Sequence, residues 1–166
     1  RPFLQAQWTG EQALAGKTIL LHAEQGLGVT VQFCRYATLL QAQGATVWME
    51  VQPPLLPLLE SLAGVDRWFR QGDDLPPFDY HCPLLSLPLA CNTTPETVPA
   101  TVPYLFAPAD GLAQWQVRLG VSRRQRVGVV WSGRPEHKND HNRSMSVQQL
   151  RPLLALSPPP SRSRRV

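Results

Sequence analysis

The segment HAEQGLGV, which begins at His22, combines side chains that transfer protons with glycines that let a ligand approach the backbone. His22 and Glu24 can each accept or donate a proton, and Gly26 and Gly28 precede a stretch with helical periodicity. A glycine turn before a helix is typical of anion sites, because the first backbone N–H groups of a helix lack partners within it. The segment predicts a ligand site, although Val29, the next residue, can do no acid–base chemistry.

Three other interpretations of this segment stay open from the residues alone. The glycines could form a tight turn that needs positive φ and binds nothing. His22 could be a hydrogen-bonded histidine of the core. The third is a nicotinamide or flavin site, because Glu50 follows the glycines by a little over twenty residues, where such sites hold a ribose. Against it, Val31 stands where the fingerprint G-x-G-x-x-G has its third glycine.

A second polar segment, SGRPEHKNDHNRS, begins at Ser132. Lys138 and Arg143 could bind a phosphate group beside the backbone of Ser132 and Gly133, since backbone N–H groups and cations both favour an anion. A solvated loop with compensating charges is the alternative.

A zinc site in this second segment is disfavoured. His137 and His141 would share one face only if the segment were helical, and Pro135 argues against a helix there. We therefore expect no metal and no bound cofactor.

The elements that would position these residues alternate along the chain. Short apolar runs bounded by turn residues predict strands, and apolar residues at three-to-four spacing predict helices. Such alternation is typical of parallel βαβ units, so we expect an α/β fold with an open, mostly parallel, Rossmann-like sheet and helices on both faces. Ligands bind such sheets outside the carboxyl ends of the strands, where both polar segments would lie. Strands are expected over 17–22, 45–51, 67–70, 78–81 and 126–131, and helices over 29–44, 55–62, 109–119 and 147–156.

Composition narrows the function classes. Arg162, Arg164 and Arg165 supply three of the 16 basic residues, which leaves 13 against 12 acidic ones, so a nucleic-acid role is disfavoured. No apolar run approaches the length of a membrane span, and the first ten residues do not resemble a secretory signal. The three cysteines form no CxxC pair. We expect a cytoplasmic domain with reduced cysteines.

Several segments together resemble glycosyltransferase family 9, the ADP-heptose:lipopolysaccharide heptosyltransferases, as a domain of bacterial tetratricopeptide-repeat proteins. The similar segments are KTILLHAEQGLG (17–28), VTVQFCRYATLL (29–40), VDRW (65–68), FDYHCPLLSLPLA (78–90), and RVGVVWSG with HKNDHNRS (126–144). The resemblance implies the N-terminal, acceptor-side domain of a GT-B fold, with 1–16 as a lead-in, 17–155 as the domain and 156–166 as an irregular tail. Tetratricopeptide repeats would precede the lead-in.

The resemblance implies an inverting transfer from a nucleotide-sugar donor to a glycan or protein acceptor, with a peripheral membrane substrate as one option. In the family an aspartate follows the glycine turn and is the catalytic base; here Val29 holds that position, and Glu24 or His22 would have to stand in. Arg143 matches the basic residue that contacts the donor phosphates, with Ser132, Gly133, Lys138 and Asn139 on the same cleft wall. The expected donor- and phosphate-binding set also includes Gly26 and Gly28 of the glycine turn.

Two further expectations follow from the resemblance. The donor site of the family lies mostly in a C-terminal Rossmann-like domain, and the proline and Ser/Arg run at 157–166 does not continue the family pattern, so we expect a truncated or frameshifted product that is weak or inactive alone. The alternative function is a noncatalytic glycan- or protein-binding module derived from the same fold.

Overall fold

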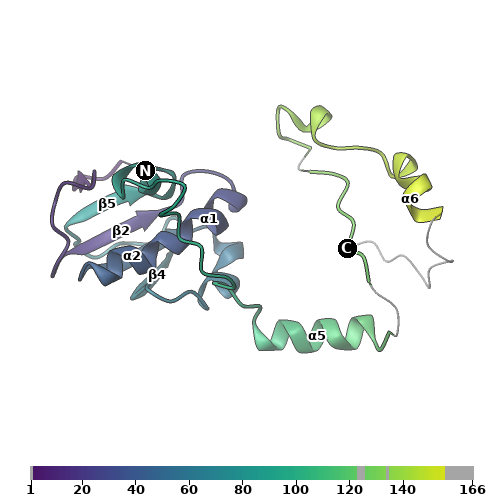
Figure 1. Ribbon diagram of the computed structural model, residues 1–166, viewed down its shortest axis with the longest axis horizontal. Helices are drawn as coiled ribbons and strands as arrows, with labels where there is room; N and C mark the ends of the chain where they lie inside the picture. Colours follow the sequence, from purple (N-terminus) through teal and green to yellow (C-terminus); the bar gives the residue numbers. More distant parts are fainter. Residues whose placement is uncertain (1, 123–125, 134, 156–166) are drawn as a thin grey trace. The chain divides into compact units, whose positions relative to one another are not determined.

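The computed structural model describes residues 2–122, 126–133 and 135–155 (Figure 1). The chain divides into two compact units, Arg1–Gly120 and Val121–Val166, and each is described by itself. The predicted tail at 156–166 lies outside the described residues.

The first unit is built on a five-stranded, all-parallel sheet, which confirms an α/β, Rossmann-like fold. Its order is β1-β5-β2-β3-β4. In the centre, β2 pairs with β3 from Thr18 to His22 and with β5 from Ile19 to His22. The strands are β1 (Ala6–Gln7), β2 (Thr18–His22), β3 (Thr46–Val51), β4 (Arg67–Arg70) and β5 (Tyr80–Pro83).

One face of the sheet carries the helices and the main core. Side chains alternate between the two faces of a strand, so Ile19 and Leu21 of β2 share one face and Leu20 lies on the other. Ile19 and Leu21 belong to one core cluster with the buried apolar residues of the helical segments. Figure 1 shows α1 and α2 across this face. The segments are α1 (Leu27–Phe33), η1 (Cys34–Tyr36), α2 (Ala37–Ala42), η2 (Pro53–Leu55), α3 (Leu56–Leu59), η3 (Leu84–Ser86) and α4 (Leu87–Ala90).

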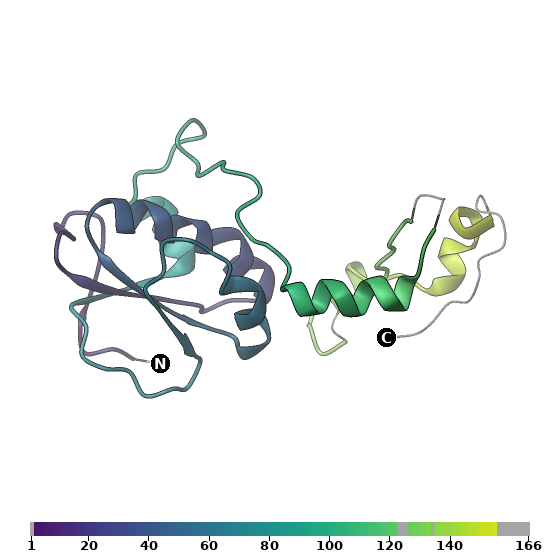
Figure 2. The same cartoon turned by 90° about the horizontal axis from the view of Figure 1, so that it is seen from below.

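The expectation of helices on both faces was wrong for the described part of this unit. The connection from β4 to β5, residues 71–79, forms no helix and runs on the side of the sheet opposite α1 and α2 (Figure 2). Pro76 and Pro77 lie in this connection, and proline disfavours a helix interior. A loop and an aromatic side chain, Phe3, therefore cover the face on which a helix was expected.

The segment that precedes β2 is integrated into the first unit. Ala6 and Gln7 pair with Tyr80 and His81 of β5, and Trp8 is almost fully buried. The Trp8 indole N–H donates to the carbonyl of Gln12 at 3.0 Å, which satisfies its only polar group. Residues of the predicted lead-in thus add an edge strand and part of the core.

Beyond the sheet, α5 (Ala109–Leu119) confirms the helix expected there, and no residue of it is buried. The second unit contains η4 (Asp140–Asn142), η5 (Val147–Leu150) and α6 (Arg151–Ala155). The strand expected over 126–131 was wrong, because these residues form no strand with any other described part of the chain and Val127 and Val130 are exposed. Alternating apolar residues stabilise a strand only when a neighbouring strand and a covered face are available.

Gly64 generates the first testable prediction. Its φ is +88°, and a Cβ atom there would lie 2.8 Å from the backbone of Thr38 at the start of α2. Gly64→Ala should therefore lower the free energy of unfolding by about 2 kcal/mol or more, from the left-handed conformation together with the clash. Gly28→Ala is the control, because a Cβ there meets nothing within 4 Å and alanine favours a helix. Urea unfolding of both variants measures the difference, and an equal stability would contradict the packing at Gly64.

Candidate ligand cleft at the carboxyl end of the sheet

The strand order creates a switch point between β2 and β5. From β2 the chain continues to β3 and β4 on one side, and then returns to β5 on the other side of β2. The segments that leave β2 and β5, α1 and η3, both start at the carboxyl edge, where sheets of this kind bind ligands. Glu24 spans this point, since its Oε1 accepts a hydrogen bond from the Leu85 N–H of η3 at 3.1 Å.

A cleft of about 480 Å³ opens at this edge. Its walls come from the end of β2 and the residues after it, from Glu50 near the end of β3, and from the residues after β4. One aromatic side chain of the N-terminal segment, Phe3, completes the lining. The volume of the cleft falls in the range of small-molecule sites. The lining residues are Phe3, His22, Ala23, Glu24, Glu50, Gln71 and Gly72.

His22 and His81 form a pair on the loop-covered face of the sheet. The distance from His22 Nε2 to His81 Nδ1 is 3.2 Å, and the Phe3 ring centroid lies 4.8 Å from each imidazole. Burial, and then the neighbouring His81, lowers the pKa of His22 to about 4, and burial also lowers the pKa of His81. Both imidazoles are therefore neutral at pH 7, and His22 is held by a polar partner as well as lining the cleft.

Glu50 and the start of the β4–β5 connection form the other wall. Glu50 is 5% exposed and lies opposite His22 in the pairing of β3 with β2. Its Oε1 accepts a hydrogen bond from the Gly72 N–H at 3.3 Å. The Gln71 side chain donates from Nε2 to the Ala23 carbonyl at 2.7 Å. These two bonds hold the connection against β2 and β3, so the wall is preformed.

The glycine turn, Gly26 to Gly28, follows β2, but its backbone conformation is not the tight turn of positive φ that the sequence left open. Gly26 is the N-cap of α1 with φ −71°, and Gly28 also lacks a positive φ, so the ligand-free tight turn of positive φ was wrong. A Cβ atom at either glycine would meet nothing within 4 Å. The space at the start of α1 is open, and Val29 behind it is half-buried.

Of the residues predicted from the sequence, His22 and Glu24 line the cleft, whereas Gly26, Gly28 and Val29 belong to the first turn of α1 and its cap. Glu50, considered first as a ribose ligand, lines the cleft as well. Sequence reasoning missed Phe3, Gln71 and Gly72. Gln71 could have been found, because it directly follows a predicted strand and so lies at the same carboxyl edge.

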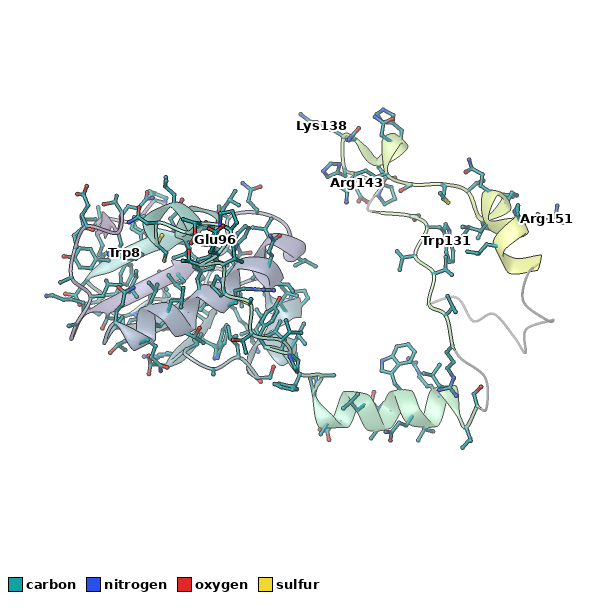
Figure 3. The ribbon with its side chains drawn as sticks, in the orientation of Figure 1. Trp8, Glu96, Trp131, Lys138, Arg143 and Arg151 are labelled. Carbon is teal, nitrogen blue, oxygen red and sulfur yellow. The ribbon has the colours of Figure 1, made fainter. Side chains whose placement is uncertain are left out.

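The second polar segment forms its own compact loop in the second unit. Ser144 Oγ accepts the Gly133 N–H and donates to Asp140 Oδ1, both at 2.7 Å. Lys138 and Arg143 are exposed on this loop (Figure 3). Ser132 Oγ contacts the Gly133 carbonyl at 3.5 Å, and the Asn142 amide donates to Asn139 Oδ1 at 2.7 Å. A shared site with the first segment stays a prediction.

Another cavity, of about 290 Å³, lies beside the 99–106 segment. Its charged lining residue is Arg35, which donates to the Pro99 carbonyl at 2.9 Å and stacks 4.0 Å from the Tyr104 ring centroid. The guanidinium thus has partners at Nη1 and on its face, whereas its buried Nε–H has no hydrogen-bond partner among the described residues. The 480 Å³ cleft is the larger of the two and is the one at the carboxyl edge of the sheet, where ligands of such folds bind.

Comparisons of the chain with protein-family models, curated proteins and solved structures found no match. Within residues 2–122, 126–133 and 135–155, no group of three or more His, Cys, Asp or Glu side chains is arranged to hold a metal ion. Over the same described residues, the helices are too short or too polar to cross a bilayer. The case for function therefore rests on the fold and the cleft.

The His22 pair generates a pH prediction. Because the pKa of folded His22 is about 4 and the ordinary value is 6.5, the unfolded chain binds more protons between these values. The free energy of unfolding should therefore fall as the pH is lowered from about 6.5 to about 4, and its pH dependence should be weaker in His22→Gln. Urea unfolding across this range measures it, with His141→Gln as a control that removes an exposed imidazole. An unchanged slope in His22→Gln would contradict the assignment.

Proposed function

We propose that this chain carries the acceptor-side domain of a family-9-type glycosyltransferase, which holds a glycan acceptor while a sugar is transferred with inversion from a nucleotide-sugar donor. The observation that carries the proposal is the cleft at the carboxyl ends of β2, β3 and β4, which carboxyl, imidazole and aromatic side chains line together. The sequence resemblance to that family implies that this unit is the acceptor-side domain.

The cleft chemistry suits a sugar. Carboxyl and amide groups such as those of Glu24 and Gln71 form hydrogen bonds with hydroxyl groups, and the Phe3 ring offers an apolar surface to the C–H face of a pyranose. Hydrogen bonds from Gly72 to Glu50 and from Gln71 to Ala23 fix the wall before a ligand arrives. Preorganisation of this kind lowers the entropic cost of binding.

The transfer itself requires a proton acceptor. The acceptor oxygen forms a new bond to the anomeric carbon, the bond from that carbon to the diphosphate oxygen breaks, and the electron pair leaves with the diphosphate. The proton of the acceptor hydroxyl must pass to a base, while cations stabilise the leaving group. Lys138 and Arg143 are the proposed cations, with Ser132, Gly133 and Asn139 beside them.

Because Val29 holds the family's base position, we expect the transfer to be weak or absent. A missing general base typically costs 10²–10⁴-fold in rate. The two side chains that could replace the base already have partners: Glu24 accepts a hydrogen bond from the Leu85 N–H, and His22 is hydrogen-bonded to His81. Those contacts favour a second candidate function, a noncatalytic module that retains the glycan-binding cleft.

Substitution at Val29 tests the enzyme against the module. Val29→Asp should raise transfer by about 10-fold or more, since it restores a carboxylate where the family has one. Val29→Asn is the matched control, because it is nearly isosteric with aspartate and accepts no proton at neutral pH. The assay follows glycosylated methyl hexosides by mass spectrometry, with ADP-, UDP- and GDP-hexoses as donors.

Two outcomes would decide against the enzyme. Equal rates in the aspartate and asparagine variants would show that position 29 does not supply the base. Absence of transfer in both variants, with hexoside binding retained, would favour the noncatalytic module.

A further inference from the structure

The cavity of about 290 Å³ lies between the helical segments of the first unit and the 99–106 segment, which contains neither helix nor strand. All of its lining residues belong to the first unit. Hydrogen bonds attach the 99–106 segment to the rest of that unit. The Tyr104 hydroxyl donates to the Val31 carbonyl at 2.9 Å, and the Phe106 N–H donates to Ser61 Oγ at 2.9 Å. The cavity is therefore enclosed by parts of the chain that are bonded to one another.

Arg35 is the charged residue of the lining, and its guanidinium group is only partly engaged. Nη1 donates to the Pro99 carbonyl at 2.9 Å, and the Tyr104 ring centroid lies 4.0 Å from Cζ. Among the described residues no aspartate or glutamate forms an ion pair with Arg35, and its buried Nε–H has no acceptor. A shielded N–H group without an acceptor is unfavourable, so this edge of the guanidinium is suited to an oxygen ligand.

A carboxylate has the geometry that this edge requires, because it accepts two parallel hydrogen bonds from neighbouring N–H groups of a guanidinium. Nη1 is engaged with Pro99, so Nε and Nη2 are the pair that remains. The lining contains no acidic side chain that would repel an anion. Since Nε is shielded from solvent, a carboxylate reaches it only when the 99–106 segment shifts, and a segment without helix or strand permits such a shift.

The rest of the lining determines what the carboxylate can be attached to. Most of these side chains are apolar or aromatic, and burial of an apolar ligand surface against them is favourable. An apolar cavity of roughly 150 Å³ is enough to bind benzene, so this cavity has room for a six-membered ring and a carboxylate. The apolar and aromatic lining residues are Leu62, Ala63, Pro99, Pro103, Tyr104 and Phe106.

We propose that this cavity binds a small carboxylic acid anion with an apolar body, and that Arg35 is its anion-binding residue. The carboxylate takes the Nε and Nη2 edge of the guanidinium, and the apolar body packs against the proline and aromatic walls. This site shares no lining residue with the 480 Å³ cleft and does not rest on the proposed function.

Three small probes test the proposal on the full chain. Benzoate has both the charge and the ring, benzamide keeps the ring without the charge, and acetate keeps the charge without the ring. Dissociation constants come from amide chemical shifts of Thr38, Ala63 and Thr101 in NMR titrations at pH 7. We expect benzoate to bind at least about 10-fold more tightly than either of the others, because charge-assisted hydrogen bonds and apolar burial each contribute to its affinity.

Substitutions of Arg35 test the role of the guanidinium. Arg35→Gln removes the charge and the paired donors, so benzoate should then bind no more tightly than benzamide. Arg35→Lys keeps the charge without the paired donors and should weaken benzoate binding by about 3-fold or more, which tests the same point if Arg35→Gln does not fold. Arg118→Gln is the matched control, because Arg118 also stacks on an aromatic ring, that of Trp115, but does not line the cavity. It should leave the affinity unchanged.

The contrary results are distinct. Equal affinities for benzoate and benzamide, or an unchanged benzoate affinity in the Arg35 variants, would overturn the role of Arg35. Equal affinities for benzoate and acetate would overturn the role of the apolar walls. An absence of shifts with every probe would overturn the site as a whole. Shifts at Ala23, Glu24 and Gln71 instead would place the probe in the 480 Å³ cleft and would overturn the proposal as well.

Discussion

The parallel pairing of β2 with β3 on one side and β5 on the other is the constraint on which the rest of the first unit depends. This pairing buries Ile19, Leu20 and Leu21 completely, and it brings the ends of three strands to one edge. Because β5 enters the sheet on the opposite side of β2 from β3, a switch point forms there. The cleft is a consequence of this strand order together with the loop that connects β4 to β5.

The connection from β4 to β5 distinguishes this sheet from a doubly wound one. In a doubly wound sheet, a helix normally covers each face, but here residues 71–79 cross the second face as a loop. The loop leaves room for polar side chains on that face, and His22, His81 and Glu50 occupy it with Phe3 packed among the imidazoles. A helix in its place would have required apolar residues at these positions.

The sequence predicts elements well where burial is local and strong. The four strands from β2 to β5 were expected because each is a short run bounded by turn residues. Glu24 and His22 were expected to lie at a ligand site because ligands bind such sheets at the carboxyl ends of the strands. Two residues of β1 are too few for a periodic signal, so its pairing with β5 could not be predicted. Residues 126–131 have a strand-like composition, but no strand within 2–122, 126–133 and 135–155 pairs with them. Phe3 reaches the cleft through a tertiary contact that no local pattern encodes.

We propose that the cleft at the carboxyl ends of β2, β3 and β4 is the ligand site of a glycosyltransferase-type domain. The most direct test is a crystal structure of the protein soaked with an uncharged methyl hexoside. The account predicts density for the sugar between Phe3, Glu24 and Glu50, with hydroxyl groups bonded to the carboxyl oxygens. Density beside Arg35 and Tyr104 in the smaller cavity, with the cleft empty, would contradict it.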